Sequence, residues 1–242
     1  MLNLHRVAFV SLLIAASAMV AAGQEKQDDK LPPALKSYLG RDVAQTMHYA
    51  GAPWLVRESR QREEDCATLL KELRLKPGMV ACDMGCGNGF YTLKMAKQVA
   101  PKGEVLAVDI QQEMLRLLEE RAKKEEIKGV KPVLGTLIDP QLPKGKVDLI
   151  LCVDVYHEFS HPVHMLAKMR ESLAPGGQIA LAEFRLEDPK VPIKLLHKMS
   201  KKQILKEYNA NGLKLSREYD KLPWQHLMFF ERDETWKAPE EK

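Results

Sequence analysis

The residues with the clearest chemical pattern lie between positions 83 and 89, where an acid and three glycines alternate as Asp83-x-Gly85-x-Gly87-x-Gly89. A short apolar run, residues 79–82, precedes them, and a helix is predicted over residues 90–99 directly after them. Glycine lets a backbone turn sharply and approach a ligand closely, and a helix N-terminus offers free N–H groups. The spacing therefore predicts a strand–loop–helix unit that holds a nucleotide-like cofactor.

Position 90 separates two kinds of nucleotide-binding loop. The dinucleotide pattern G-x-G-x-x-G needs a third glycine three residues after Gly87, where this chain has Phe90. The carboxylate of Asp83 at the strand end would also repel a pyrophosphate. The sequence therefore argues against NAD or FAD as the cofactor.

A second acid follows at the end of the next predicted strand, residues 104–109. The carboxylate of Asp109 can accept hydrogen bonds from both hydroxyls of a ribose. Its alternative role is to cap the helix predicted over residues 111–124, where apolar residues recur at helical spacing. Both roles are consistent with this position.

The run from Asp83 to Gly89 resembles motif I of the class I S-adenosylmethionine-dependent methyltransferases. The resemblance implies S-adenosyl-L-methionine as cofactor, with the acid near its cationic end and the glycines under its ribose and methionine. Adenine contacts are then expected after the third strand, where Thr136 replaces the Gly-Asp of many relatives. The cofactor-binding residues expected on this basis are Asp83, Gly85, Cys86, Gly87, Gly89, Asp109, Ile110, Thr136 and Leu137.

Predicted strands and helices alternate along most of the chain, which is typical of a doubly wound α/β sheet. This pattern resembles the seven-stranded methyltransferase fold, which is mostly parallel with an antiparallel last strand, over residues 58–232. A single domain with an N-terminal extension is expected. Further helices are predicted over residues 58–73, 162–173 and 200–211, and further strands over 130–134, 147–152, 178–184, 213–219 and 226–232, with a turn at 175–177.

The residues after the fourth predicted strand carry the candidate catalytic groups. Ligands of open α/β sheets bind beyond the carboxyl ends of the strands, and the resemblance places this strand beside the first. We expect His157 to take a proton from the acceptor, Glu158 or Asp154 to orient it, and Tyr156 to pack against the sulfonium methyl. The alternative is that His157 and Glu158 only cap the loop and the next helix.

The same segment matches the zinc-hydrolase pattern H-E-x-x-H as His157-Glu158-x-x-His161. That chemistry needs both histidines on one face of a helix, one turn apart. Pro162 disfavours helical backbone at His161 and suits a first helical position, so the helix should begin where the motif ends. We therefore expect no metal in the site. An exported zinc hydrolase and a non-catalytic S-adenosylmethionine-binding protein remain the alternative functions.

The N-terminus has the pattern of a secretory signal peptide. His5-Arg6 precedes an apolar run, residues 7–22, and small residues and then charged ones follow. The run is short for a membrane-spanning helix, although an uncleaved anchor is the alternative. We expect export to the periplasm or outside, and the domains are a signal peptide (1–23), a linker and possible active-site lid (24–57), the methyltransferase domain (58–232) and a charged tail (233–242).

Composition limits the partners. The chain has 242 residues, of which 45% are hydrophobic, and this fits one α/β domain with a substantial core. A net charge of +4 gives no reason to expect nucleic acid. We expect a small-molecule or lipid-like methyl acceptor, a monomer or dimer, and membrane contact through the N-terminal segment. Aromatic residues such as Trp54 either cover the site or pack on the sheet edge.

Four cysteines, an even number, would permit disulfides in an exported chain. Their positions in predicted core strands and in the glycine loop favour buried free thiols instead. The pairing to check is Cys82 with Cys152, which should lie on adjacent strands; the other two cysteines are Cys66 and Cys86.

Overall fold

The computed structural model describes residues 31–238, so the predicted signal segment and the last four positions lie outside the described residues. Of the described residues, those from Leu35 onward form one compact unit. Within the described part of the chain, every helix is too short or too polar to cross a bilayer.

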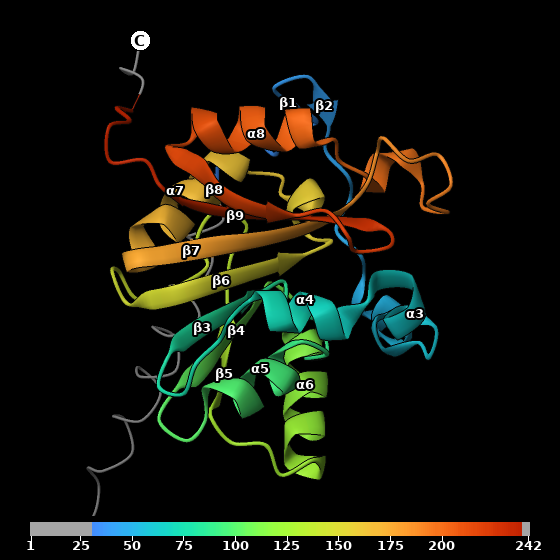
Figure 1. The fold of residues 1–242 in the computed structure, drawn as a ribbon, viewed down its shortest axis with the longest axis vertical. Helices are drawn as coiled ribbons and strands as arrows, with labels where there is room; N and C mark the ends of the chain where they lie inside the picture. The colour runs from blue at the N-terminus through green and yellow to red at the C-terminus, as the bar shows by residue number, and fades with distance from the viewer. Residues whose placement is uncertain (1–30, 239–242) are drawn as a thin grey trace, which may run out of the picture. The chain divides into compact units, whose positions relative to one another are not determined.

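A seven-stranded sheet in the order β5-β4-β3-β6-β7-β9-β8 is the centre of this unit (Figure 1). All neighbours from β5 to β7 are parallel, whereas β9 runs antiparallel to both β7 and β8. This confirms the predicted doubly wound sheet with an antiparallel last strand. The strands are β3 (Val80–Met84), β4 (Glu104–Asp109), β5 (Val130–Leu134), β6 (Val147–Val153), β7 (Leu173–Phe184), β8 (Leu213–Tyr219) and β9 (Gln225–Arg232).

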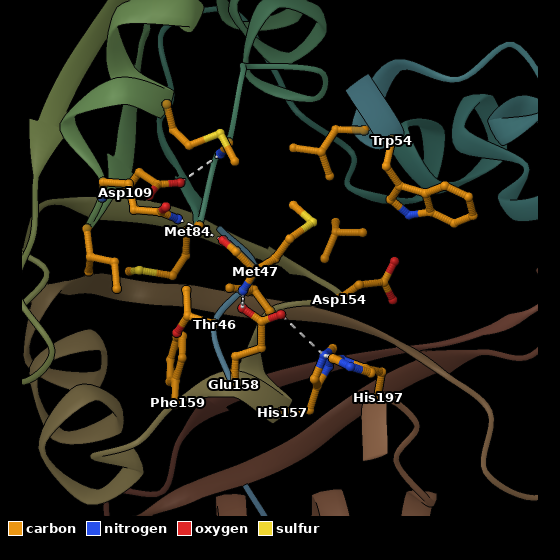
Figure 2. Close-up of a pocket in the computed structure, with 18 of the residues that line it drawn as sticks. Thr46, Met47, Trp54, Met84, Asp109, Asp154, His157, Glu158, Phe159 and His197 are labelled. Carbon is orange, nitrogen blue, oxygen red and sulfur yellow. Dashed lines mark hydrogen bonds and ion pairs between the residues drawn. The ribbon is translucent and has the colours of Figure 1, made fainter. Parts of the chain in front are cut away.

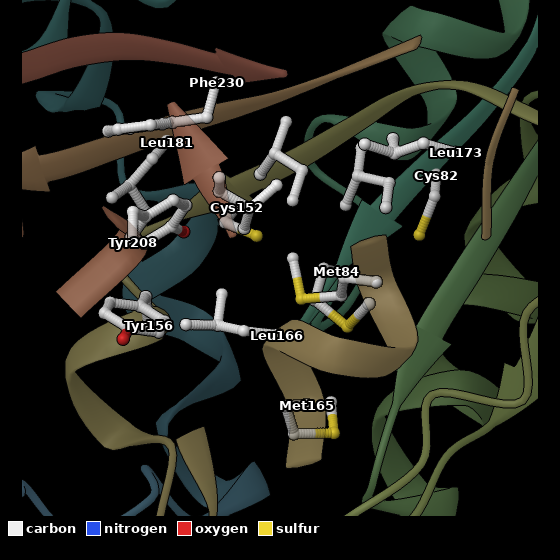
Figure 3. Close-up of a cluster of buried hydrophobic side chains, with 14 of the residues drawn as sticks. Cys82, Met84, Cys152, Tyr156, Met165, Leu166, Leu173, Leu181, Tyr208 and Phe230 are labelled. Carbon is white, nitrogen blue, oxygen red and sulfur yellow. The ribbon is translucent and has the colours of Figure 1, made fainter. Parts of the chain in front are cut away.

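Helices cover both faces of the sheet because its central strands are apolar on both sides. On one face, α7 (Pro162–Ser172) and α8 (Lys201–Ala210) pack against strand residues that include Cys82 and Cys152 (Figure 3). On the other face lie α4 (Cys66–Glu72), α5 (Thr92–Val99) and α6 (Gln112–Lys124). The carboxyl ends of β3, β4 and β6 therefore meet at one edge, between two helical layers.

The single helix predicted over residues 58–73 is wrong. The chain forms α3 (Arg60–Glu64) and α4, separated by Asp65 in the left-handed region at φ 48°. A short polar side chain tolerates this conformation, and the Asp65 carboxylate caps α4 by accepting from the Thr68 N–H. The break turns α3 toward the ligand-binding edge of the sheet.

Segment boundaries differ elsewhere by small amounts, with one larger exception. Strand β7 begins at Leu173, so the turn predicted at residues 175–177 is part of this strand. Residues 35–57, predicted as linker and lid, belong to the compact unit. They form β1 (Ser37–Tyr38), β2 (Arg41–Asp42) and the 3-10 helix η1 (Tyr49–Val56). Arg41 of β2 pairs with buried Glu207 of α8 at 2.7 Å.

All four cysteines are buried free thiols, which confirms the prediction made for them. Cys82 of β3 and Cys152 of β6 do lie on adjacent strands, but they are not bridged.

Candidate active site

A cavity of about 430 Å³ lies at the carboxyl ends of β3, β4 and β6 (Figure 2). Its walls include Gly85 after β3, Ile110 after β4 and Asp154 after β6. Ligand sites typically occupy about 300–1,000 Å³, and open α/β sheets bind ligands where the strand order reverses, as it does between β3 and β6. The cavity therefore has the size and the place of a ligand site in this fold.

Close packing explains the first glycine of the loop. Gly85 has φ +67°, and a Cβ there would lie 2.4 Å from Cγ2 of Val155. Only a residue without a side chain lets the loop after β3 lie directly against the segment after β6. The glycine loop thus positions the candidate catalytic segment as well as the cavity floor.

The Asp109 carboxylate lines the cavity, and backbone N–H groups fix its position. Its two oxygens accept from the Gly87 and Gln111 N–H groups, each at 2.9 Å. Burial raises the pKa of Asp109 against these opposing hydrogen bonds. The N-cap residue of α6 is Gln111, so capping is not the role of Asp109. A carboxylate offers about four lone-pair sites, so the Asp109 carboxylate has capacity left for the predicted ribose contact.

The other expected cofactor residues divide into two groups. Gly85, Gly87, Asp109, Ile110, Thr136 and Leu137 line the cavity, whereas Asp83, Cys86 and Gly89 stand behind the loop and do not. The Asp83 carboxylate accepts from the Thr92 hydroxyl at 2.6 Å, and burial raises its pKa to about 6. These three residues support the loop from behind, and direct contact with the cofactor stays a prediction for them. Thr136 accepts from the Asp139 N–H in its own turn.

Three polar side chains converge on the opposite side of the cavity, and we call them the His–Glu cluster: His157, Glu158 and His197 (Figure 2). The first two lie in the 3-10 helix η2 (Tyr156–Glu158) and the third in η3 (Leu195–His197). Nε2 of His157 lies 3.1 Å from Nδ1 of His197 and 3.8 Å from Oε1 of Glu158.

Glu183, on β7, fixes the position of His157 through two hydrogen bonds. Its carboxylate accepts from Nδ1 of His157 at 2.7 Å and from the His157 backbone N–H at 3.2 Å. Glu183 is fully buried. Because a carboxylate only accepts, Nδ1 carries a proton and Nε2 is the nitrogen that faces the cluster.

Burial and charge act differently on the three cluster residues. Burial disfavours the imidazolium of His157, but the Glu183 carboxylate outweighs this and the pKa of His157 is raised. Burial raises the pKa of Glu158 to about 7, although the Met47 N–H donates to its Oε2 at 3.1 Å. Burial and the neighbouring His157 lower the pKa of His197. The pKa values of His157 and Glu158 are thus both raised, whereas that of His197 is lowered.

Only some of the predicted catalytic residues line the cavity. His157, Glu158 and Asp154 line the cavity, but Tyr156 does not. Tyr156 is fully buried and its hydroxyl donates to Glu207 at 2.7 Å, so its predicted contact with the methyl group is wrong. The partner of the His157 Nδ1 is Glu183, while Glu158 lies 3.8 Å from Nε2; the orienting roles of Glu158 and Asp154 stay predictions.

Glu183 and His197 were missed as functional residues. A signal existed for Glu183, since it is the one acid in the apolar run of residues 179–184. His197 lies in a basic stretch that looks like a solvated helix face, and its sequence offers no comparable signal. Both reach the site from segments remote from His157 along the chain.

The residues that match the zinc-hydrolase pattern do not lie on one helix. His157 and Glu158 belong to η2, His161 is the N-cap of α7, and α7 begins at Pro162 as predicted. His161 is outside the cavity lining, and its Nδ1 bonds to the Ser160 hydroxyl at 2.9 Å.

Residues 46–57 form one wall of the cavity, through side chains that include Met47 and Trp54. Backbone contacts hold it there: Gln111 Nε2 donates to the Met47 carbonyl, and Asn88 Nδ2 to the Ala52 carbonyl, both at 2.9 Å. Trp54 lines the cavity, and 49% of it is exposed.

Helix α3 adds charged groups to the same cavity. Arg60 pairs with Glu64 at 2.8 Å, and Arg57 bonds to the other oxygen of Glu64 at 2.6 Å. Close by in the lining, Oδ1 of Asp154 is buried without a hydrogen-bond partner among the described residues, while its Oδ2 accepts from Gln225. An unpaired carboxylate oxygen and an arginine fit a ligand with an ammonium and a carboxylate, as in the methionine part of S-adenosylmethionine.

Comparison with known proteins agrees with this geometry. A family model described as a methyltransferase domain matches residues 75–231. A SAM-dependent methyltransferase of known structure from Aquifex aeolicus is 25% identical with a TM-score of 0.72, covering 76% of this chain and 98% of its own.

Curated relatives match over shorter parts. The demethylmenaquinone methyltransferase of Staphylococcus carnosus is 26% identical, and the match covers 69% of this chain and 68% of that protein. An uncharacterized 37.1 kDa transposon protein of Streptomyces fradiae is 32% identical over 48% of this chain, but the chain spans only 33% of its length. With its glycine loop, its strand order and a family match over more than half its length, the chain belongs to the methyltransferase-domain family, in the class I S-adenosylmethionine-dependent group.

Proposed function

We propose that this chain transfers the methyl group of S-adenosylmethionine to a small molecule that carries a hydroxyl group. The observation that carries this proposal is the shared cavity. Asp109 and the glycine loop stand on one side of it, and the His–Glu cluster stands on the other.

The cofactor fits the first side through three sets of contacts. Asp109 would accept from the ribose hydroxyls, and Asp154 and Arg60 would receive the methionine ammonium and carboxylate. The exposed apolar side chains Ile110 and Leu137 would pack on the adenine. These assignments use groups that line the cavity and leave Asp83 in its supporting place.

Positioning would supply most of the rate enhancement. The bound cofactor offers an electrophilic methyl group on a sulfonium, and the acceptor displaces it in line. Holding the two partners aligned and dry supplies on the order of 7–11 kcal/mol. A hydroxyl acceptor must also lose its proton. The basic nitrogens and the carboxylate of the His–Glu cluster line the part of the cavity that we assign to the acceptor.

The remaining walls favour a largely apolar acceptor. Met47, Phe159, Phe184 and Ile193 line the cavity around the cluster. A small or lipid-like molecule with one hydroxyl at its end would match these walls. The name of the Staphylococcus carnosus relative, a demethylmenaquinone methyltransferase, supports a small, lipid-like acceptor.

The test is methyl transfer from isotope-labelled S-adenosylmethionine to a panel of apolar phenols and hydroxyquinones. We expect a labelled product with the wild type. Glu183→Gln should lower kcat by roughly 10–100-fold, within the contribution of about 10²–10⁴ that acid–base groups make. It should leave cofactor affinity unchanged, since Glu183 does not line the cavity. Cofactor binding without transfer to any acceptor would favour the non-catalytic binding protein instead.

A further inference from the structure

The His–Glu cluster has a feature that acceptor binding alone does not explain. Two imidazole nitrogens, Nε2 of His157 and Nδ1 of His197, face each other at 3.1 Å. A carboxylate oxygen of Glu158 lies 3.8 Å from the first nitrogen. Facing lone pairs repel unless a proton or a cation lies between them. We propose that the His–Glu cluster binds a divalent transition-metal ion, with Zn²⁺ as the first candidate.

The separations suit one shared ion. Zinc binds histidine nitrogen and carboxylate oxygen at about 2.0–2.2 Å, so two ligands of a tetrahedral ion lie about 3.4 Å apart. The two distances of 3.1 and 3.8 Å fall on either side of this value. All three ligand atoms lie within 4.8 Å of one another. Two histidines and one carboxylate are also a common ligand set for zinc with an open position.

Glu183 matches the outer ligand that such sites have. Histidine ligands usually donate their second ring N–H to a carboxylate, which fixes the tautomer and makes the free nitrogen a better ligand. Nδ1 of His157 donates to Glu183 in this way at 2.7 Å. The Met47 N–H similarly holds Oε2 of Glu158 and leaves Oε1 for the ion.

This site is different from the one that the H-E-x-x-H pattern suggests. It uses His157 and Glu158 but replaces His161 with His197, which comes from η3. All three ligand residues line the cavity, so an open coordination position faces the space for the acceptor.

The inference rests on the proposed function and names the acceptor atom as oxygen. The acceptor hydroxyl binds the ion through its oxygen, and its O–H bond breaks as the proton passes to solvent water. The oxygen lone pair then forms the bond to the methyl carbon while the carbon–sulfur bond breaks, and sulfur keeps that electron pair. The metal thus does what a strong base would otherwise have to do.

The test is metal binding by the full-length protein. The chain is treated with a chelator, dialysed against excess Zn²⁺ and then against metal-free buffer, and its metal content is measured by mass spectrometry. We expect one equivalent per chain. Co²⁺ in place of Zn²⁺ should give the visible absorption of a low-symmetry site, which reports the ligand geometry directly. Absence of retained metal in the wild type would overturn the proposal.

Variants locate the ion. His197→Ala and Glu158→Gln should abolish stoichiometric binding, and Glu183→Gln should weaken affinity by about 10–100-fold. The matched control is His164→Ala, an exposed histidine of α7 outside the cluster, which should retain one equivalent. If His164→Ala loses the metal while His197→Ala keeps it, the ion is bound outside the His–Glu cluster and the proposal is wrong.

Failure here and failure of the proposed function give different results. Full methyl transfer by the chelator-treated wild type would overturn the metal site and leave the methyltransferase proposal intact. Binding of one Zn²⁺ that depends on His197, in a chain that does not bind S-adenosylmethionine, would support the site and overturn the function.

Discussion

At the scale of single residues, the two aspartates of the cofactor loops differ in what they face. Asp109 faces the cavity with lone pairs left for a ligand, whereas Asp83 turns toward Thr92 beneath the glycine loop. One carboxylate can therefore bind a ligand, and the other carries a buried charge. Substitutions at the two positions should have unlike effects.

Asp109→Ala removes the group assigned to the ribose hydroxyls. Loss of a charge-assisted hydrogen bond costs about 1.5–3 kcal/mol, so S-adenosylmethionine should bind about 10–150-fold more weakly. Titration calorimetry measures this directly. Glu113→Ala on α6 is the control, since it removes the same charge from an exposed position outside the cavity. Equal affinity in the wild type and in Asp109→Ala would remove Asp109 from the ribose.

Because the pKa of Asp83 is raised in the folded chain, we expect the stability of the protein to depend on pH. Its pKa is about 6 in the folded chain against 3.8 for the free group, so the native state holds its proton more tightly. Stability from this group is therefore highest below pH 4 and is lost as pH rises through 6, by up to about 3 kcal/mol. Asp83→Asn keeps the Thr92 contact and removes this loss.

The measurement is the free energy of unfolding of the cofactor-free protein in denaturant at pH 4 and pH 7.5. Asp83→Asn should gain stability over the wild type at the higher pH and little at the lower one. A difference between the two proteins that does not change with pH would show that Asp83 is not a buried charge.

Single residues near one another in sequence were predictable, and partners from remote segments were not. Asp109 and His157 stand at strand ends, where the fold places ligands, so their positions followed from the strand pattern. Glu183 and His197 meet His157 only after β7 and η3 have packed beside η2. No sequence spacing predicts these contacts of Glu183 and His197 with His157.

At the scale of elements, the alternation of apolar strands and amphipathic helices was enough to predict the sheet. No helix separates the two strands predicted over residues 213–219 and 226–232, and they pair antiparallel as β8 and β9. The break between α3 and α4 was not predictable from the helical spacing of residues 58–73. It depends on Asp65 adopting a left-handed conformation, which tertiary packing favours over a continuous helix.

Gly85→Ala tests the contact between the glycine loop and the catalytic segment. A Cβ at Gly85 would lie 2.4 Å from Val155, whereas one at Gly145 meets nothing within 4 Å, and the two share φ values of +67° and +66°. Both alanines incur the strain of positive φ, about 1–2 kcal/mol. Only Gly85→Ala adds overpacking, typically about 1–3 kcal/mol, and shifts the segment that carries His157.

Denaturant unfolding and cofactor titration of the two alanine variants give the comparison. Gly85→Ala should be the less stable and should bind S-adenosylmethionine more weakly, while Gly145→Ala should bind like the wild type. Equal stability and equal affinity of the two variants would mean that the loop does not depend on close contact with Val155.

At the scale of the whole molecule, we propose that residues 1–23 direct export and take no part in the fold. The compact unit begins at Leu35, and the contacts of the cavity wall start within residues 41–57. A chain that begins at Gln24 should therefore be soluble and bind S-adenosylmethionine like the full chain. N-terminal sequencing of the protein from its native host tests the processing. An intact Met1 on cytosolic protein would contradict export, and aggregation of the shortened chain would contradict the boundary.

The central claim is that the cavity between the glycine loop and the His–Glu cluster binds S-adenosylmethionine rather than a dinucleotide. Calorimetric titration of the full-length protein with S-adenosylmethionine, and separately with NAD, tests it most directly. We expect saturable binding of one S-adenosylmethionine per chain and no binding of NAD. Binding of NAD, or no heat from S-adenosylmethionine, would contradict it.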